Sequence, residues 1–253
     1  MTTFRELHRT GEPLLLPNAW DYASAAALAE AGFAAIGTTS LGVAAAHGLP
    51  DGHGLARSET VALARLLHRL PCPFTVDIEA GFGADPAEVA DLATELASLG
   101  AAGVNLEDGR PHGTLADPAR QVELIEAVKR ATPDLFVNAR IDTYWLGVDD
   151  STAERADRYT AAGADGIFVP GLADEDRIRE LLGTIAVPLN ILYLPHRHTV
   201  RRLAELGVRR ISTGSLLYRT GLHAAVGAAL AIRDGEPIPL NPPGYAEIQR
   251  LSQ

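Results

Sequence analysis

Three acidic residues have the type and spacing needed to hold a divalent cation. Asp77 and Glu79 end an apolar, strand-like run that begins at Phe74, and Glu107 ends a second such run. Residues two apart on a strand share a face, so Asp77 and Glu79 are expected to point the same way and Ile78 the other way. Glu107 follows about one strand–helix–strand unit later, which would place it on the neighbouring parallel strand. Converging carboxylates need a cation to neutralise them, and the hard cations that prefer oxygen ligands are Mg²⁺ and Mn²⁺. The sequence therefore predicts an enzyme with a Mg²⁺ (or Mn²⁺) site.

The composition limits the class of protein and its partners. The chain has 253 residues, of which 47% are hydrophobic, which is enough for one large domain with a sizeable core. The net charge is -10 and the basic residues form no long run, so neither nucleic acid nor a membrane is an expected partner.

The cysteine count and the amino terminus indicate the compartment. Cys72 is the single cysteine, which excludes intramolecular disulfides and cysteine-rich zinc sites. The first residues lack the apolar core of a signal peptide, and no apolar stretch reaches the roughly 20 residues needed to cross a bilayer. A soluble cytoplasmic protein is expected.

Strand-like and helix-like patterns alternate along the chain. Apolar residues at three- and four-residue spacing predict helices over 23–31, 59–69, 86–99, 118–130, 152–162, 175–182, 200–206 and 216–232. Short β-like runs between them predict strands over 14–17, 33–37, 74–77, 103–106, 135–139, 166–169, 189–192 and 208–212.

The ends of the predicted helices carry the expected residues. Asp85-Pro86 and Asp117-Pro118 each place a capping Asp before a Pro at the first helical position. Glycines, which favour the left-handed C-cap, follow four helices at Gly32, Gly100, Gly163 and Gly207.

About eight β/α units without a break in composition favour a (β/α)₈ TIM-type barrel over residues 1–253 as a single domain. The alternative is a doubly wound open sheet, which usually has fewer units, and no Gly-x-Gly-x-x-Gly follows the first strand. The barrel would be followed by a C-terminal helix and a proline-rich tail from Asp234 to Gln253, which could wrap the surface or a partner subunit.

In a barrel, the loops that follow the strands form the active face. Polar groups concentrate in these loops, whereas the opposite loops, such as Leu99-Gly100-Ala101, carry none. In strand order, the polar positions are Asn18 to Asp21, Thr38 to Ser40, Asp77 and Glu79, Glu107 and Asp108, Asn138 with Arg140 and Asp142, Asn190, and Thr213 to Ser215.

These motifs occur in an order that resembles the isocitrate lyase/phosphoenolpyruvate mutase superfamily. The resemblance runs from about Leu15 to Arg219 and rests on Trp20, Thr39-Ser40, Pro50-Asp51-Gly52, Asp77-Ile78-Glu79, Leu106-Glu107-Asp108, Ala139-Arg140 and Asn190. It implies a Mg²⁺-dependent barrel that makes or breaks C–C or C–P bonds in 2-oxo or 2-hydroxy acids through an enolate. It also implies a homodimer or homotetramer, with the last helix exchanged between subunits.

The resemblance assigns roles residue by residue. Asp77, Glu79 and Glu107 match metal-holding carboxylates, some of which act through water. Thr39, Ser40 and Leu41 match the loop that holds the substrate carboxylate, and Trp20 would be either a core residue or part of the pocket wall. Asp51 matches a residue that assists proton handling, although its Pro-Asp-Gly setting is also that of an ordinary turn. Arg140 and Asn190 match residues that bind the oxyanion and the leaving or attacking fragment.

The stretch after Glu107 departs from the superfamily pattern. Lyases of this superfamily carry Lys-x-Cys-Gly-His there, and this chain has Gly109-Arg110-Pro111-His112-Gly113-Thr114. The missing cysteine argues against isocitrate or methylisocitrate cleavage. His112 is either a solvent-exposed residue or a mobile catalytic acid or base. His53 and the other scattered histidines lack zinc spacing and are expected to be surface or packing residues.

The predicted function is therefore that of a Mg²⁺-dependent lyase or hydrolase. Its substrate would be a small carboxylic acid, an oxaloacetate-like or substituted-malate-like 2-oxo or 2-hydroxy di-acid cleaved at a C–C bond through an enolate. Two alternatives remain, namely C–P chemistry of the phosphonopyruvate hydrolase or phosphoenolpyruvate mutase type, and a barrel that binds a carboxylate without catalysis. The bond cleaved, the proton donor and the competence of the Gly109–Thr114 flap are left open.

Overall fold

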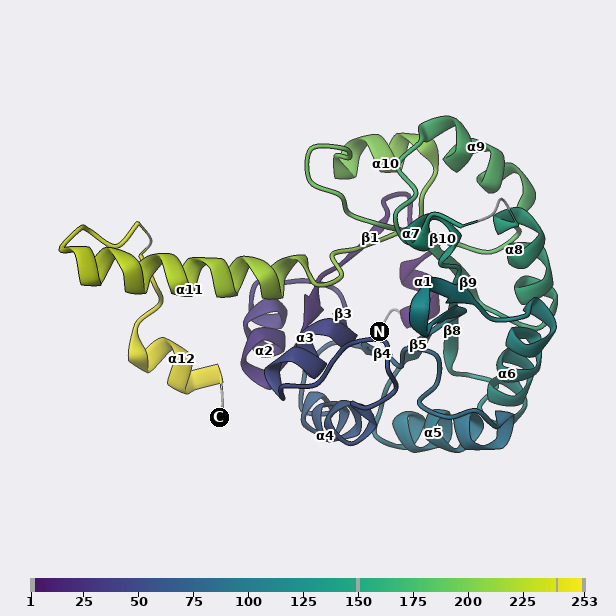
Figure 1. The fold of residues 1–253 in the computed structure, drawn as a ribbon, viewed down its shortest axis with the longest axis horizontal. Coiled ribbons are helices and arrows are strands. Elements are labelled where there is room, and N and C mark those ends of the chain that lie inside the picture. The colour runs from purple at the N-terminus through teal and green to yellow at the C-terminus, as the bar shows by residue number, and fades with distance from the viewer. Residues whose placement is uncertain (1–2, 149–150, 240, 252–253) are drawn as a thin grey trace.

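The sheet closes into a barrel, as predicted. The structure, a computed structural model, describes residues 3–148, 151–239 and 241–251. Nine parallel strands form one sheet in the order β1-β11-β10-β9-β8-β5-β4-β3-β2. Only Pro17 separates β1 from β2, so the two ends of this sheet belong to one chain segment and the barrel has eight sides (Figure 1).

The observed strands agree with the predicted ones to within three residues at each end. They are β1 (Leu14–Leu16), β2 (Asn18–Ala19), β3 (Ile36–Thr38), β4 (Phe74–Asp77), β5 (Gly103–Glu107), β8 (Phe136–Arg140), β9 (Gly166–Val169), β10 (Leu189–Leu192) and β11 (Arg210–Ser212). A separate antiparallel hairpin, β6 (Gly109–Arg110) and β7 (Thr114–Leu115), encloses a 3-10 turn at Pro111–Gly113.

Helices surround the barrel (Figure 1). The predicted helices are observed as α2 (Tyr22–Glu30), α4 (Arg57–Leu67), α5 (Pro86–Ser98), α6 (Pro118–Ala131), α8 (Thr152–Ala161), α9 (Glu175–Thr184), α10 (Val200–Leu206) and α11 (Leu216–Asp234). Four short helices were not predicted: α1 (Phe4–Leu7), α3 (Ser40–Ala46), α7 (Thr143–Leu146) and α12 (Tyr245–Leu251).

The predicted helix ends are confirmed. Asp85 accepts a hydrogen bond from the Ala87 N–H and forms a capping box with Glu88, and Asp117 accepts one from the Ala119 N–H. The four predicted C-terminal glycines all have positive φ, from 89° to 100°.

The apolar core lies between the sheet and the helices, because outward-facing strand residues are covered by helices in a parallel sheet. The strand residues Val76, Val104, Val137, Ile167, Ile191 and Ile211 are all fully buried there. In the part of the chain that the structure describes, no helix is both long and apolar enough to traverse a bilayer.

The inside of the barrel is polar at its centre. The Asn138 side-chain amide donates to Asn105 Oδ1 at 2.9 Å, and Arg210 Nη2 donates to the same oxygen at 3.2 Å. Arg210 is buried and has no ion pair with any residue in the described ranges.

The last long helix leaves the barrel. Figure 1 shows α11 projecting away from the strands and α12 returning toward α2, where Arg250 lies 3.3 Å from Glu30. Along α11, Leu222, Val226, Leu230 and Ile232 are between 44% and 65% exposed. In the single chain, this 19-residue helix therefore exposes apolar side chains that no other element covers among the described residues.

Candidate functional site

The carboxyl ends of adjacent strands bring the predicted charged residues together. Asp77 is the last residue of β4, Glu107 the last of β5 and Arg140 the last of β8. Glu107 and Arg140 are register partners, and Asp77 pairs in register with Asn105 one layer below them. Parallel pairing therefore places these side chains at one end of the barrel.

Arg140 is the cationic centre of this end. Its Nη1 lies 2.7 Å from Glu107 Oε2, and its Nε donates to Asp142 Oδ1 at 2.6 Å. Burial alone would lower the pKa of Arg140, but Glu107, Asp142 and Asp77 outweigh it and raise the pKa above its usual value. The guanidinium is therefore charged, held in place by two carboxylates.

Glu79 reaches the site by a route that differs from the prediction. Strand β4 ends at Asp77, and Glu79 has a left-handed backbone with φ of 48°, so the strand alternation used to orient it does not apply. Its N–H donates to Asp77 Oδ1 at 3.1 Å, and its Oε2 accepts from the Gly54 N–H at 2.9 Å. Its Oε1 is buried without a hydrogen-bond partner. A turn, rather than a strand face, brings Glu79 beside Asp77.

The site carries more negative than positive charge. Burial raises the pKa of Asp77 and that of Glu107, and neighbouring carboxylates raise them further, whereas Arg140 opposes the increase. Burial also raises the pKa of Glu79 to about 7, with Asp51 and Asp77 adding to the shift. Buried carboxylates that destabilise one another in this way are stabilised by a bound cation.

These residues fit a divalent cation held partly through water. Asp77 opens to the cavity, and the unpartnered Glu79 Oε1 offers a free oxygen. Glu107 shares its carboxylate with Arg140. Within the described ranges, no three Asp, Glu, His or Cys side chains are close enough to hold one ion directly. Because Mg²⁺ usually keeps several of its waters, such an arrangement suits it.

The cavity at this end of the barrel is small and polar. It has a volume of about 90 Å³ and adjoins a second hollow of about 250 Å³. Ser40, Asp51, Arg140 and Trp145 line both. The smaller part is also lined by Thr39, Leu41, Asp77 and Asn105, and the larger by Glu107, His112, His53 and Asp142. The predicted Thr39-Ser40-Leu41 loop, Asp51 and Arg140 thus meet at one place.

Two predicted substrate-binding residues are not among the side chains that line the cavity. Trp20 packs edge-to-face on Tyr218, with ring centroids 5.4 Å apart, and is not among the cavity-lining residues. Asn190 is buried inside the barrel, where its Oδ1 accepts from Ser212 Oγ at 2.8 Å and its Nδ2 has no partner. Trp20 thus packs against α11, and Asn190 lies directly beneath Ser212, which lines the smaller cavity.

The flap after Glu107 is a β-hairpin, β6–β7. His112 is exposed at its tip with φ of 65° and lines the larger hollow. Arg110 is tied to the base of the hairpin, where Nη1 donates to Glu107 O at 3.0 Å and Nη2 to Gln121 Oε1 at 3.3 Å. Arg110 and His112 both line the larger hollow, but the Arg110 guanidinium is held at the base of the hairpin whereas His112 is exposed at its tip.

A buried ionic cluster around Asp108, which the sequence did not reveal, holds Arg140 in place through Asp142. Asp108 is fully buried, lies 3.0 Å from Arg155 Nη1 and accepts from the Tyr159 hydroxyl at 2.7 Å. Its other oxygen accepts from the Asp142 N–H at 2.9 Å. Asp108 thus orients Asp142, which in turn holds Arg140. The adjacency of Asp108 to Glu107 was visible, but its partners come from α8, 47 and 51 residues later.

Sequence reasoning also missed several cavity walls. Trp145 and Phe168 lie about 6 Å from the Arg140 guanidinium carbon, measured to their ring centroids. His53, expected at the surface or in packing, is exposed and lines the larger hollow beside Asp51. Trp145 lies in the unpredicted helix α7. The one sequence feature that could have pointed to Trp145 as a cavity residue is its position five residues after Arg140.

Known proteins are similar to this chain in sequence and in fold. The family model for phosphoenolpyruvate phosphomutase matches residues 4–233. An uncharacterized protein of Mycobacterium tuberculosis (strain ATCC 25618 / H37Rv) is 48% identical over 250 residues, covering 98% of this chain and 95% of that protein. Oxaloacetate decarboxylase of Pseudomonas fluorescens (strain SBW25) is 30% identical over 245 residues, covering 91% and 84%. A crystal structure of a Burkholderia cenocepacia J2315 protein superposes with a TM-score of 0.83 at 39% identity, covering 90% of this chain and 97% of that one.

The match spans almost the whole barrel, including every strand that carries a site residue. The predicted superfamily and the prediction of an enzyme are confirmed. The chain belongs to the phosphoenolpyruvate phosphomutase family and is a lyase/mutase-type enzyme of the isocitrate lyase/phosphoenolpyruvate mutase superfamily.

Proposed function

We propose that the protein is a Mg²⁺-dependent lyase that cleaves a C–C bond in a small 2-oxo or 2-hydroxy di-acid through an enolate. The observation that carries this proposal is the position of Arg140, a buried and charged guanidinium at the mouth of the barrel beside an excess of carboxylates. The relative named oxaloacetate decarboxylase supports a substrate of oxaloacetate type.

Arg140 would stabilise the charge that develops during cleavage. A fixed guanidinium in a water-poor pocket stabilises an enolate oxygen more strongly than water does, because it needs no reorganisation as charge develops. Glu107 and Asp142 hold it, and the aromatic rings of Trp145 and Phe168 lie near its faces.

The loop that begins α3 would hold the substrate carboxylate. Thr39, Ser40 and Leu41 line the cavity, and the backbone N–H groups of Ser40 and Leu41 have no partner within the helix. These donors and the Ser40 hydroxyl suit a carboxylate oxygen. A cavity of this size accepts an acid of a few carbons but not a bulky one.

Asp77, Glu79 and Glu107 would hold the cation, the last two through water. Bound Mg²⁺ would supply Lewis-acid polarisation of the substrate's oxygen atoms. Asp51 and His112 both face the larger hollow and are the groups placed to move a proton to or from the carbon that loses its substituent.

A second candidate is cleavage or rearrangement of a C–P bond. The description of the matching family as phosphoenolpyruvate phosphomutase favours it. The absence of lysine from the Gly109–Thr114 hairpin argues against it, because in this superfamily C–P chemistry usually depends on a lysine-bearing loop at that position.

The two candidates separate in one experiment. Purified protein is incubated with Mg²⁺ and either oxaloacetate, a 2-substituted malate panel or phosphonopyruvate, and products are followed by proton and phosphorus NMR. Mg²⁺-dependent pyruvate or oxalate formation that Arg140→Met strongly reduces supports the first candidate. Inorganic phosphate or phosphoenolpyruvate from phosphonopyruvate supports the second. Tight oxalate binding without any turnover would instead indicate a carboxylate-binding barrel.

We also propose that α11 packs on another subunit, in a homodimer or homotetramer. Leu222, Val226 and Leu230 recur every four residues and form an apolar face that is exposed in the single chain, on a helix that projects away from the barrel (Figure 1). Val226→Glu should shift the mass measured by light scattering to that of a monomer, whereas Leu66→Glu, on the exposed part of α4, should not. An unchanged mass for Val226→Glu would contradict the exchange of this helix.

A further inference from the structure

A larger cavity lies at the opposite end of the barrel from the candidate active site. It has a volume of about 530 Å³, and its walls come from α1 and from the segments that lead into strands β8 to β11. This volume falls within the range of small-molecule sites, which is roughly 300 to 1,000 Å³. The cavity is thus several times larger than the one beside Asp77.

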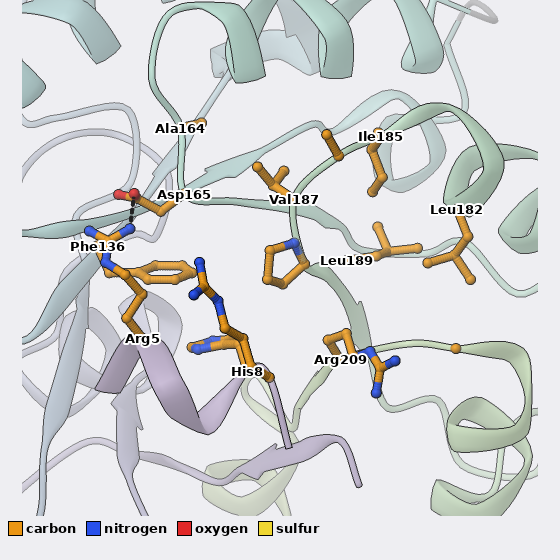
Figure 2. Close-up of a pocket in the computed structure, with 14 residues that line it drawn as sticks. Arg5, His8, Phe136, Ala164, Asp165, Leu182, Ile185, Val187, Leu189 and Arg209 are labelled. Atoms are coloured by element: carbon orange, nitrogen blue, oxygen red, sulfur yellow. Dashed lines mark hydrogen bonds and ion pairs between the residues drawn. The ribbon is translucent and has the colours of Figure 1, made fainter. Parts of the chain in front are cut away.

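The cavity has a cationic side and an apolar side. Figure 2 shows Arg5, His8 and Arg209 on one side and Val187, Ile185 and Leu182 across from them. Arg9 is a further lining residue. Three arginines around one hollow are notable in a chain whose net charge is -10.

The acid at the edge of this cavity is already neutralised. Asp165 pairs with Arg5 through one oxygen (Figure 2), and its other oxygen lies 2.9 Å from Lys129 Nζ and accepts from the Val137 N–H at 2.9 Å. Two cations therefore face this single carboxylate. The group as a whole keeps a positive charge.

The guanidinium groups of Arg9 and Arg209 have hydrogen-bond donors that could bind an anion. Arg209 Nη1 donates only to the carbonyls of Thr10 and Gly11, at 3.2 and 3.4 Å. In the ranges that the structure covers, neither arginine forms an ion pair with an acidic side chain, and the charge of Arg9 acts on Glu6 only at a distance. Both side chains thus keep donors available for an anion.

The positive potential extends beneath the cavity. His8 is buried, stacks on Phe136 with centroids 4.5 Å apart, and has its Nδ1 3.0 Å from Phe4 O. Burial lowers the pKa of His8 to about 3, and the charges of Arg210 and Arg5 lower it further. His8 is therefore neutral and adds no charge to that of the arginines around it.

We propose that this cavity is a second binding site, which takes a small organic anion with an apolar body. The acidic group, a carboxylate or a phosphate monoester, would pair with Arg9 and Arg209, and an aliphatic or aromatic part would lie on Ile185 and Val187. An anion without an apolar part would contact only the arginines. An uncharged apolar molecule would contact only the aliphatic side chains.

Calorimetry with defined probes tests the proposal. Hexanoate and hexyl phosphate are titrated into the full-length protein at low ionic strength, with hexanol, acetate and inorganic phosphate as partial probes. We expect saturable binding of hexanoate or hexyl phosphate, weakened about tenfold by Arg9→Gln or by Arg209→Gln, because each removes charge-assisted hydrogen bonds. The comparison of the two probes decides between carboxylate and phosphate.

Arg201→Gln is the matched control, because Arg201 lies on α10 outside the cavity and its side chain is 90% exposed. It should leave binding unchanged. Ile185→Ser should weaken hexanoate binding but not that of any partial probe without a chain. The proposal is overturned if neither probe binds saturably, if binding survives both cavity arginine substitutions, or if hexanol binds as tightly as hexanoate.

Discussion

Arg140 and Glu107 face each other across adjacent strands, with the guanidinium Nη1 2.7 Å from the carboxylate Oε2. This pair joins the two parts of the site, since Arg140 faces the cavity and Glu107 belongs to the acidic group beside it. Under the proposed function, this contact has both a stabilising role and a catalytic role, and substitutions can separate the two.

Arg140→Met should lower kcat/KM by roughly 10²- to 10³-fold, because the preorganised charge that stabilises the enolate is lost. It should also lower the free energy of unfolding by roughly 3 kcal/mol, because Glu107 and Asp142 are left buried without a cation. Adding Glu107→Gln should restore part of the stability, measured by urea unfolding, without restoring turnover. Recovery of both together would show that Arg140 acts only through the fold.

Asp108→Asn should reduce turnover although Asp108 does not line the cavity. Its carboxylate orients Asp142 through a 2.9 Å hydrogen bond and is the ion-pair partner of Arg155. We expect a lower kcat with little change in KM, since the substrate's own contacts remain. Tyr159→Phe, which removes one hydrogen bond to the same carboxylate, should reduce stability by about 1 kcal/mol and leave kcat close to that of the parent. An equal fall in kcat for both variants would contradict a positioning role.

Mg²⁺ should raise the midpoint of thermal unfolding. A ligand present at a hundred times its Kd stabilises the folded state by about 2.7 kcal/mol, which corresponds to roughly 5 to 11 °C for a chain of this length. Asp77→Asn and Glu79→Gln should remove most of this increase, whereas Glu126→Gln, an exposed acid on α6, should keep it. An increase that is identical in all four proteins would place the cation elsewhere.

His8 should make the fold sensitive to acid. Its pKa is lowered from 6.5 to about 3 in the folded chain, so the unfolded chain binds a proton more readily. The contribution of neutral His8 to stability is therefore fully present above about pH 6.5 and is lost as the pH falls toward 3. The free energy of unfolding changes over this range with a slope of up to one proton per pH unit. His8→Gln should flatten the difference in unfolding free energy between pH 7 and pH 4, as measured by urea titration.

The exposed His68, at the end of α4, supplies the control for His8. His68→Gln should leave the dependence on pH unchanged. If the unfolding free energy of His8→Gln depends on pH in the same way as that of the parent chain, the acid sensitivity comes from other groups.

The sequence by itself determined the barrel. Each β/α unit carries local signals, such as the Asp85-Pro86 start of α5 and the glycine that follows each of four helices, and these agree with the observed boundaries. Such signals depend on residues a few positions apart, so they can be interpreted without a partner from elsewhere in the chain. The sequence also placed Asp77, Glu107 and Arg140 at strand ends, because parallel strands align their carboxyl ends.

Only the tertiary structure decided which side chains meet. Glu79 was expected on a strand face and lies in a left-handed turn, and Asn190 is buried inside the barrel with Ser212 as its hydrogen-bond partner. The Asp108–Arg155 pair joins residues 47 positions apart, and the arginines of the opposite cavity come from both ends of the chain. Contacts of this kind depend on how the closed barrel aligns distant strands, and no local pattern encodes that alignment.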